Sequence, residues 1–222
     1  MKADAANLSV VDLIGNRLRE DIISGRLASG EQLIEVDIAD AYSASRNSIR
    51  EVLHLLVRDG LATAIRHRGV FVRTFCEGDL QDIYTARRVV QLSAIRSGPA
   101  YGPVLLDQLG GIIAQARQAI SQGRWQDVGT LSLAFHQALV SVLGSRLIDE
   151  FFLNISAQLR LIFTTGPDER IVQKPMWVEW EARIYACLLK GDYAEAESEL
   201  TAYLAESQLA LSRIVRRYEE AP

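Results

Sequence analysis

Apolar residues in the first sixty positions recur at helical spacing. The series from Leu8 to Ile23, followed by Gly25, predicts a helix over about 8–24. A loop that contains Gly30 precedes a shorter helical pattern over about 35–42. A third pattern starts after Ser45, a residue type that caps helix N-termini, and ends before Gly60. The pattern therefore predicts three short helices in succession.

The pattern changes after Gly60 to two short β-like segments. These are LATAI over 61–65 and VFVR over 70–73, and the basic tip RHRG over 66–69 joins them. Three helices followed by a hairpin with a basic tip are typical of a winged helix-turn-helix.

From Asp79 onward the apolar spacing is helical throughout. We predict helices over about 79–97, 103–122, 125–143, 145–164, 175–190 and 192–217, with glycine or proline at the breaks. The chain is thus expected to be mainly α: a winged helix-turn-helix with a small β-hairpin wing over 1–75, and an all-α helical-bundle domain over 79–218.

Charge is distributed unevenly along the chain. The formal net charge is −4, yet residues 42–73 hold six arginines against Glu51 and Asp59, a net of +4. A local basic segment in an acidic chain is the footprint of a DNA-contacting surface. The alternative reading of such a segment is an ordinary solvated face.

The composition points to the cytoplasm. No apolar run approaches the roughly 20 residues that span a bilayer, and the first ten residues lack the apolar core of a secretion signal. Cys76 and Cys187 lie far apart in sequence and outside any metal-binding spacing. We expect no membrane partner.

Residues 13–73 contain a series of short motifs. They are Ile23-x-Gly25-x-Leu27, Gly30-Glu31-x-Leu33, the run SRNSIREVL over 45–53, the run LVRDGL over 56–61 and the wing RGVFV over 68–72. In these motifs and their spacing the segment resembles the DNA-binding domain of the GntR family of regulators. The chain departs from the family at the turn over 42–44, where Tyr-Ser-Ala stands and a glycine is usual.

The C-terminal half resembles the ligand-binding domain of the FadR-type (FCD) branch of that family. The marks are the segments IYTARR over 83–88, FHQAL over 135–139, GSRL over 144–147 and Gly191-Asp192 after the helix that holds Ile184. The resemblance implies a homodimer that binds a short palindromic operator in double-stranded DNA. It also implies a small-molecule effector, with a carboxylate as the candidate, whose binding to the C-terminal domain changes DNA affinity, as in a repressor.

The expected DNA contacts lie on the third helix and at the wing tip. Arginine pairs with the O6 and N7 acceptors of guanine, asparagine pairs with adenine, and serine suits phosphate oxygens. A glycine permits the tight turn of the wing. The predicted contacts are Ser45, Arg46, Asn47, Ser48 and Arg50 on the helix, and Arg66, His67, Arg68 and Gly69 in the wing.

The resemblance also locates an interior site in the helical domain. Many relatives hold a divalent metal there with an aspartate and three histidines. Counting along the chain gives Ser132, His136, Glu181 and Tyr203 at these positions. Since serine and tyrosine are poor ligands for a transition metal, we expect no metal and no cofactor. The four residues are instead expected to contact the effector; the alternative for His136 is a hydrogen-bonded core residue.

Two arginines are further candidates for effector binding. Arg87 aligns with an arginine that faces the effector carboxylate in relatives, and Arg160 is a second candidate of this kind. The alternative for Arg87 is a salt bridge with Asp79, Asp82 or another helix. The tryptophans at 125, 177 and 180 either line a pocket or belong to the core.

Two other function classes stay open at this point. One is a metal-dependent enzyme that uses His136 and Glu181 and carries an accessory DNA-binding domain. The other is a constitutive DNA-binding protein whose sensor pocket has decayed. The sequence contains neither a serine nucleophile elbow nor a P-loop, which argues against an enzyme.

Overall fold

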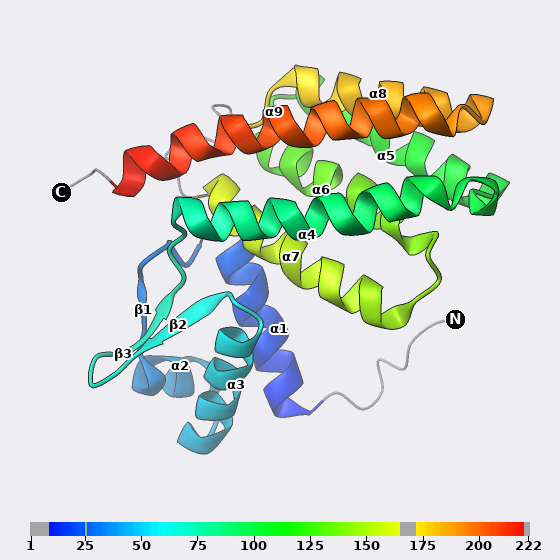
Figure 1. The fold of residues 1–222 in the computed structure, drawn as a ribbon. Helices are drawn as coiled ribbons and strands as arrows, with labels where there is room; N and C mark the ends of the chain where they lie inside the picture. Colours follow the sequence, from blue (N-terminus) through cyan, green and yellow to red (C-terminus); the bar gives the residue numbers. More distant parts are fainter. Residues whose placement is uncertain (1–8, 25, 165–171, 220–222) are drawn as a thin grey trace. The chain divides into compact units, whose positions relative to one another are not determined.

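The computed structural model describes residues 9–24, 26–164 and 172–219 and divides into two compact units, which are Met1–Thr74 and Phe75–Pro222 (Figure 1). Each unit has its own core, and each is described by itself.

Unit 1 contains the three predicted helices, α1 Val10–Ile23, α2 Glu35–Tyr42 and α3 Arg46–Arg58. Ser9 caps α1 in a capping box, accepting from the backbone N–H of Asp12 while the Asp12 carboxylate accepts from Ser9. Most of the predicted apolar stripes of α1 and α3 form the core of the unit, while Leu8 and Gly25 of the first predicted helix lie outside the described residues. The buried members are Ile14, Leu18 and Ile22 on α1 and Ile49, Val52, Leu53 and Leu56 on α3.

The wing belongs to a three-stranded antiparallel sheet of order β1-β3-β2. Strands β2 Ala62–Ile65 and β3 Gly69–Val72 form the predicted hairpin, with Ile65 opposite Gly69. The sheet also has a strand that the pattern did not predict, β1 Gln32–Leu33, which pairs with β3. Two residues are too few to show an alternating pattern, so tertiary pairing creates this strand.

The turn between α2 and α3 contains a strained backbone. Ser43 has φ 50° and ψ 41°, in the left-handed region, where it ends α2. The next amide, of Ala44, donates to the carbonyl of Ala39. This left-handed residue lies in the turn over 42–44, where the GntR-like pattern usually has a glycine, a residue without a Cβ to clash.

Unit 2 is a bundle of helices that follow the predicted pattern to within a few residues. They are α4 Glu77–Arg96, α5 Pro103–Ser121, α6 Trp125–Ser141, α7 Arg146–Thr164, α8 Pro175–Lys190 and α9 Tyr193–Glu219, and a 3-10 turn at Gly98–Ala100 precedes α5. Helix α9 packs between α4 and α8, α6 packs on α4, α5 and α7, and α5 also packs on α8 (Figure 1).

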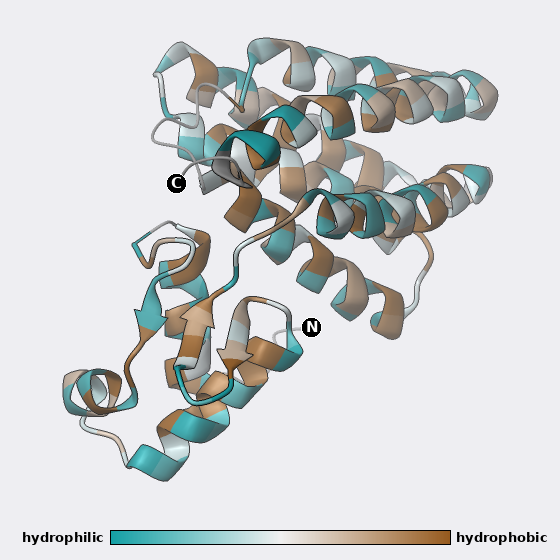
Figure 2. Cartoon of the chain, turned by 60° about the vertical axis from the view of Figure 1, so that its left-hand side comes forward, coloured by the Kyte–Doolittle hydropathy of each residue, from teal (hydrophilic) through white to brown (hydrophobic). Residues whose placement is uncertain are grey.

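Each of these helices carries both hydrophobic and hydrophilic residues, as expected of amphipathic helices in a bundle (Figure 2). Gly110 lets α5 pack closely on α8, since a Cβ there would lie 2.6 Å from the hydroxyl of Tyr185 unless that side chain shifted. The apolar residues of α5 lie against the core of their own unit: Leu109 and Ile113 are buried, and Leu105, Leu106 and Ile112 are half-buried.

Candidate DNA-contacting surface and ligand cavity

Helix α3 presents its basic residues to solvent. Arg46, Asn47 and Arg50 are exposed, whereas Ile49 between them is fully buried. Ser45 caps the helix, because its hydroxyl accepts from the backbone N–H of Ser48 at 3.1 Å. The polar face predicted for DNA contact is thus on the surface of a well-capped helix.

One of these arginines is held by the preceding helix. The Nε of Arg50 donates to the Oε2 of Glu35, the first residue of α2, at 2.9 Å. Both side chains are accessible, with 57% of Arg50 and 36% of Glu35 exposed. The GntR-like residue pattern gave no sign of this pair, because its members lie on different helices.

The wing tip is exposed and held by the unpredicted strand. Arg66, His67 and Arg68 are exposed, and His67 and Gly69 have φ angles of 60° and 109°. Gln32 of β1 donates from Nε2 to the carbonyl of Arg68 at 2.9 Å. Strand β1 therefore fixes the tip that carries the basic side chains.

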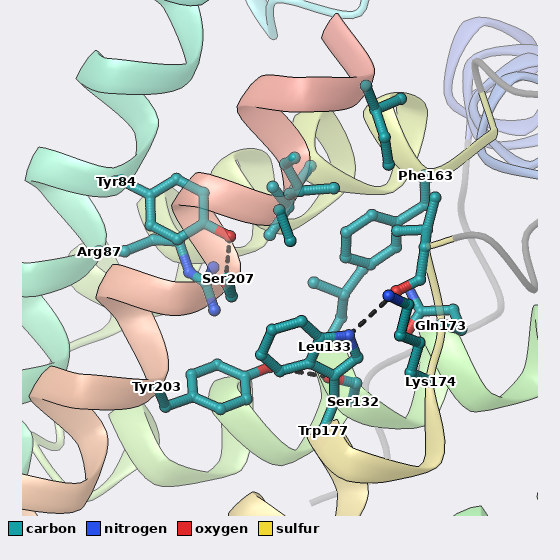
Figure 3. A pocket seen from close by; sticks show the side chains of 15 residues that line it. Tyr84, Arg87, Ser132, Leu133, Phe163, Gln173, Lys174, Trp177, Tyr203 and Ser207 are labelled. Carbon is teal, nitrogen blue, oxygen red and sulfur yellow. Dashed lines mark hydrogen bonds between the residues drawn. The ribbon is translucent and has the colours of Figure 1, made fainter.

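A cavity lies inside unit 2 between α4, α6, α7, α8 and α9 (Figure 3). Its free volume is about 30 Å³, enough for a few water molecules at most. The lining is mainly apolar, and includes Leu159, Phe163, Trp177, Leu211 and Ile214. Polar groups reach it from α4, α6 and α9: Tyr84, Arg87, Ser132, Tyr203 and Ser207.

Arg87 supplies a buried positive charge at this cavity. It is 2% exposed, and its guanidinium carbon lies 4.8 Å from the centre of the Tyr84 ring. The Tyr84 hydroxyl is in turn hydrogen-bonded to Ser207. Within the described part of the chain no carboxylate forms an ion pair with Arg87, and Asp82, one predicted alternative partner, is exposed. Arg87 is therefore positioned to meet an anion in the cavity.

The four residues located by counting do come together beside the cavity. Glu181 Oε1 accepts from Ser132 Oγ at 2.5 Å and from Tyr203 at 3.3 Å, and it lies 3.7 Å from His136 Nε2. Ser132 and Tyr203 line the cavity, whereas His136 and Glu181 form a layer behind them. The ring of His136 lies 4.9 Å from that of Tyr203.

Burial disfavours charge on both members of this inner layer. Desolvation raises the pKa of Glu181 to about 7, although the hydrogen bonds from Ser132 and Tyr203 and the charge of Arg87 oppose the rise. Desolvation, and then the charge of Arg87, lower the pKa of His136 well below its usual value. Neither ring nitrogen of His136 has a hydrogen-bond partner among the described residues. The alternative of a hydrogen-bonded core histidine is therefore not what the structure shows.

The donor set does not fit a transition metal. His136 and Glu181 are the two good ligands of the cluster, while Ser132 and Tyr203 offer neutral hydroxyls. Stable zinc sites need at least three nitrogen, sulfur or carboxylate ligands. No group of three or more His, Cys, Asp or Glu side chains suited to a metal occurs over the described ranges.

The remaining sequence candidates, one arginine and three tryptophans, lie only in part at the cavity. Arg160 is buried but is not part of the cavity lining, and it donates to the backbone carbonyl of Gln126 at 3.4 Å. Trp177 lines the cavity and stacks on Trp180, with 6.3 Å between the ring centres. Trp125 is half-buried against the core and not part of the lining. Gln173 and Lys174, which the sequence did not single out, also line the cavity.

Both units match known domains. Residues 11–72 match the bacterial regulatory proteins of the gntR family, and residues 82–206 match the FCD domain. The chain belongs to the gntR family of bacterial regulatory proteins. These are the domains of transcription regulators and not of enzymes.

Individual relatives agree with this membership. A crystal structure described as a GntR transcriptional regulator from Rhodococcus sp. RHA1 superposes with a TM-score of 0.84 at 30% identity, over 92% of this chain and 98% of that one. The HTH-type transcriptional repressor RspR of Escherichia coli K12 is 24% identical over 89% of this chain and 86% of its own length.

A further match is shorter. The HTH-type transcriptional regulator BphR of Paraburkholderia xenovorans is 33% identical to this chain over 42% of this chain and 38% of the length of BphR. This partial match supports membership of the family but says nothing about the activity of the whole protein.

None of the helices in the described part of this gntR-family chain has the length and hydrophobicity of a membrane-spanning segment.

Proposed function

We propose that this gntR-family chain is a transcriptional repressor whose binding to a short palindromic operator is controlled by a small organic acid in the cavity of unit 2. The proposal has two parts: ligand binding, here called the ligand half, and DNA binding, here called the DNA half. The ligand half is supported by Arg87, a buried guanidinium at an otherwise largely apolar cavity, without a carboxylate ion-pair partner among the described residues. The DNA half is supported by the family match.

The DNA half of the proposal rests on exposed basic groups on two elements of unit 1. Arg46, Asn47 and Arg50 of α3 are suited to base edges in the major groove, and Ser45 and Ser48 to phosphates. Arg66, His67 and Arg68 of the wing suit the minor groove or the backbone, and Gly69 allows the turn.

The ligand half rests on the polarity of the cavity wall. A carboxylate can pair with Arg87, while the phenolic and serine hydroxyls around it, those of Tyr84, Tyr203 and Ser132, fix its orientation. The apolar wall around Phe163 and Trp177 suits a hydrocarbon body. His136 and Glu181 support Ser132 and Tyr203 from behind, and Arg160 is not part of this proposal.

The small free volume links ligand binding to a structural change. About 30 Å³ holds a few water molecules at most and not an organic acid, so the ligand must displace side chains. A ligand that binds the opened form better shifts the population toward it. The same small volume favours a second candidate, a constitutive DNA-binding protein with a closed pocket. A ligand screen separates the two.

We also propose that the chain acts as a homodimer in the cytoplasm, because a single winged helix reads few base pairs and two-fold symmetry lets half-sites add. The apolar residues of α5 belong to the core of unit 2 or pack against it. Other apolar side chains of unit 2 are exposed, including Val89, Val104, Leu147, Phe151 and Leu153. Sedimentation of the whole chain at micromolar concentration should show a dimer; a monomer would contradict this.

Selection from a pool of random DNA duplexes tests the whole proposal. The chain should enrich a palindromic motif, and one member of a panel of small carboxylic acids should change its affinity for that motif. Failure to enrich any motif would reject the DNA half. An enriched motif whose affinity is unchanged by every acid would support the constitutive alternative.

A further inference from the structure

We infer that Glu35 is a specificity-determining positioning residue, which holds Arg50 by its Nε so that the two terminal nitrogens of the guanidinium read a guanine. This inference rests on the proposed DNA contact of α3 and adds a role for a residue on α2.

The geometry of the pair leaves the reading edge of Arg50 available. The carboxylate of Glu35 takes the Nε hydrogen at 2.9 Å, and no hydrogen bond from the terminal nitrogens of Arg50 is found among the described residues. Two N–H groups directed at O6 and N7 make the usual bidentate contact with guanine. Glu35 thus binds the Nε of Arg50 and leaves the two terminal nitrogens of the guanidinium available for a base.

The carboxylate changes what Arg50 can do in two ways. It restrains a long side chain before binding, which reduces the conformational entropy lost when a base contact forms. It also places a negative charge beside the guanidinium, which disfavours transfer of Arg50 to a phosphate. Arg46 on the same face has no hydrogen bond or ion pair within the described part of the chain, so this restraint distinguishes Arg50 from its neighbour.

Weakening of the restraint should lower sequence specificity and raise non-specific binding. Glu35→Gln removes the negative charge and leaves only a neutral amide oxygen to accept from the Nε of Arg50. Arg50 should then reach a phosphate more readily, so preference for guanine at one position should fall about tenfold. Binding to random-sequence duplexes should rise severalfold. The slope of the logarithm of the binding constant against the logarithm of the salt concentration should become steeper by about 1, as expected for one added phosphate contact.

The test is motif selection from a random duplex pool with the whole chain, together with salt titrations. The matched control is Asp37→Asn, which removes an exposed carboxylate from the same first turn of α2. Arg50→Ala should lose guanine preference at the same position as Glu35→Gln, and the double variant should resemble Arg50→Ala.

The outcomes separate this inference from the function on which it rests. If the wild-type chain enriches no motif, both fail. If it enriches a motif that Glu35→Gln leaves unchanged, or changes no more than Asp37→Asn does, the role of Glu35 is rejected while the function stands. Loss of preference at a different position from Arg50→Ala also rejects it.

Discussion

The Nε2 of His136 on α6 lies 3.7 Å from the Oε1 of Glu181 on α8, and both side chains are 1% exposed. Burial of these two titratable groups disfavours their charged forms, so the pKa of Glu181 rises to about 7 and the pKa of His136 falls well below its usual value. The hydroxyls of Ser132 and Tyr203 hydrogen-bond to the same carboxyl group. These four side chains therefore form a buried polar cluster close to the buried cation Arg87.

Glu181→Gln should stabilise unit 2 at neutral and higher pH. Because the folded-state pKa of Glu181 is about 7 against an ordinary 4.5, the unfolded chain loses this proton first. The carboxyl group thus costs stability as the pH rises through that window, up to roughly 3 kcal/mol. The variant keeps an acceptor for Ser132. Urea unfolding followed by fluorescence suits this test, because all three tryptophans lie in unit 2.

The stability difference between Glu181→Gln and wild type should be small at pH 4.5, grow to about pH 7 and then stay constant. The difference from wild type is used because His136 also makes stability depend on pH, in the opposite direction to Glu181. The lowered pKa of His136 removes stability as the pH falls below 6.5, and this contribution is the same in both proteins. Glu179→Gln, an exposed carboxylate paired with Arg117, is the control. A difference that does not vary with pH would contradict the prediction.

Protein purified without chelators should contain no stoichiometric zinc, nickel or manganese. The cluster has two good metal ligands, one fewer than a stable site requires. Elemental analysis measures the metal content, and a chelator should leave the thermal unfolding temperature unchanged. One equivalent of metal that His136→Ala removes would show that the cluster binds a metal after all.

Arg87→Met should abolish the response to small carboxylic acids. The substitution keeps an unbranched apolar side chain but removes the cation that pairs with the carboxylate. Fluorescence titration with acetate through octanoate and with benzoate is suitable, since Trp177 lines the cavity. The matched control is Arg88→Met, because Arg88 bonds to Gln208 and is not part of the lining. Equal responses of the two variants would reject the role of Arg87.

Arg46→Ala and Arg50→Ala should each weaken binding to the selected motif by about 1–3 kcal/mol. Both side chains are exposed on α3, and their loss leaves the buried stripe of the helix intact. Titrations at one fixed salt concentration measure the effect. Arg213→Ala, an exposed arginine of α9, controls for the loss of one positive charge. Wild-type affinity in both α3 variants would reject the surface.

Ser43→Gly should stabilise the turn between α2 and α3. A non-glycine residue at φ 50° pays a steric cost of about 1–2 kcal/mol, partly offset by the greater entropy of glycine in the unfolded chain. Hydrogen exchange of the α3 amides should therefore slow in this variant. Ser43→Val should accelerate it, because a β-branched side chain tolerates this conformation poorly. Unchanged exchange in both variants would contradict the strain.

The sequence by itself determined the helices, the wing and the family. Long periodic stripes such as those of α1 and α3 report burial directly, and glycine and proline mark where the helices end. The family pattern also located Ser132, His136, Glu181 and Tyr203, whose side chains meet in the structure. Spacing along helices suffices for this, since a stable helix fixes which positions share a face.

Only the tertiary structure decided the features that depend on contact between distant segments. Strand β1 exists because β3 pairs with it, and two residues carry no periodic signal. Arg160 and Arg87 are both arginines on apolar helices, but packing places only Arg87 at the cavity. The apolar stripe of α5 packs against the core of its own unit, which helical spacing alone does not reveal. The ion pair of Glu35 and Arg50 joins two helices, so no local pattern encodes it.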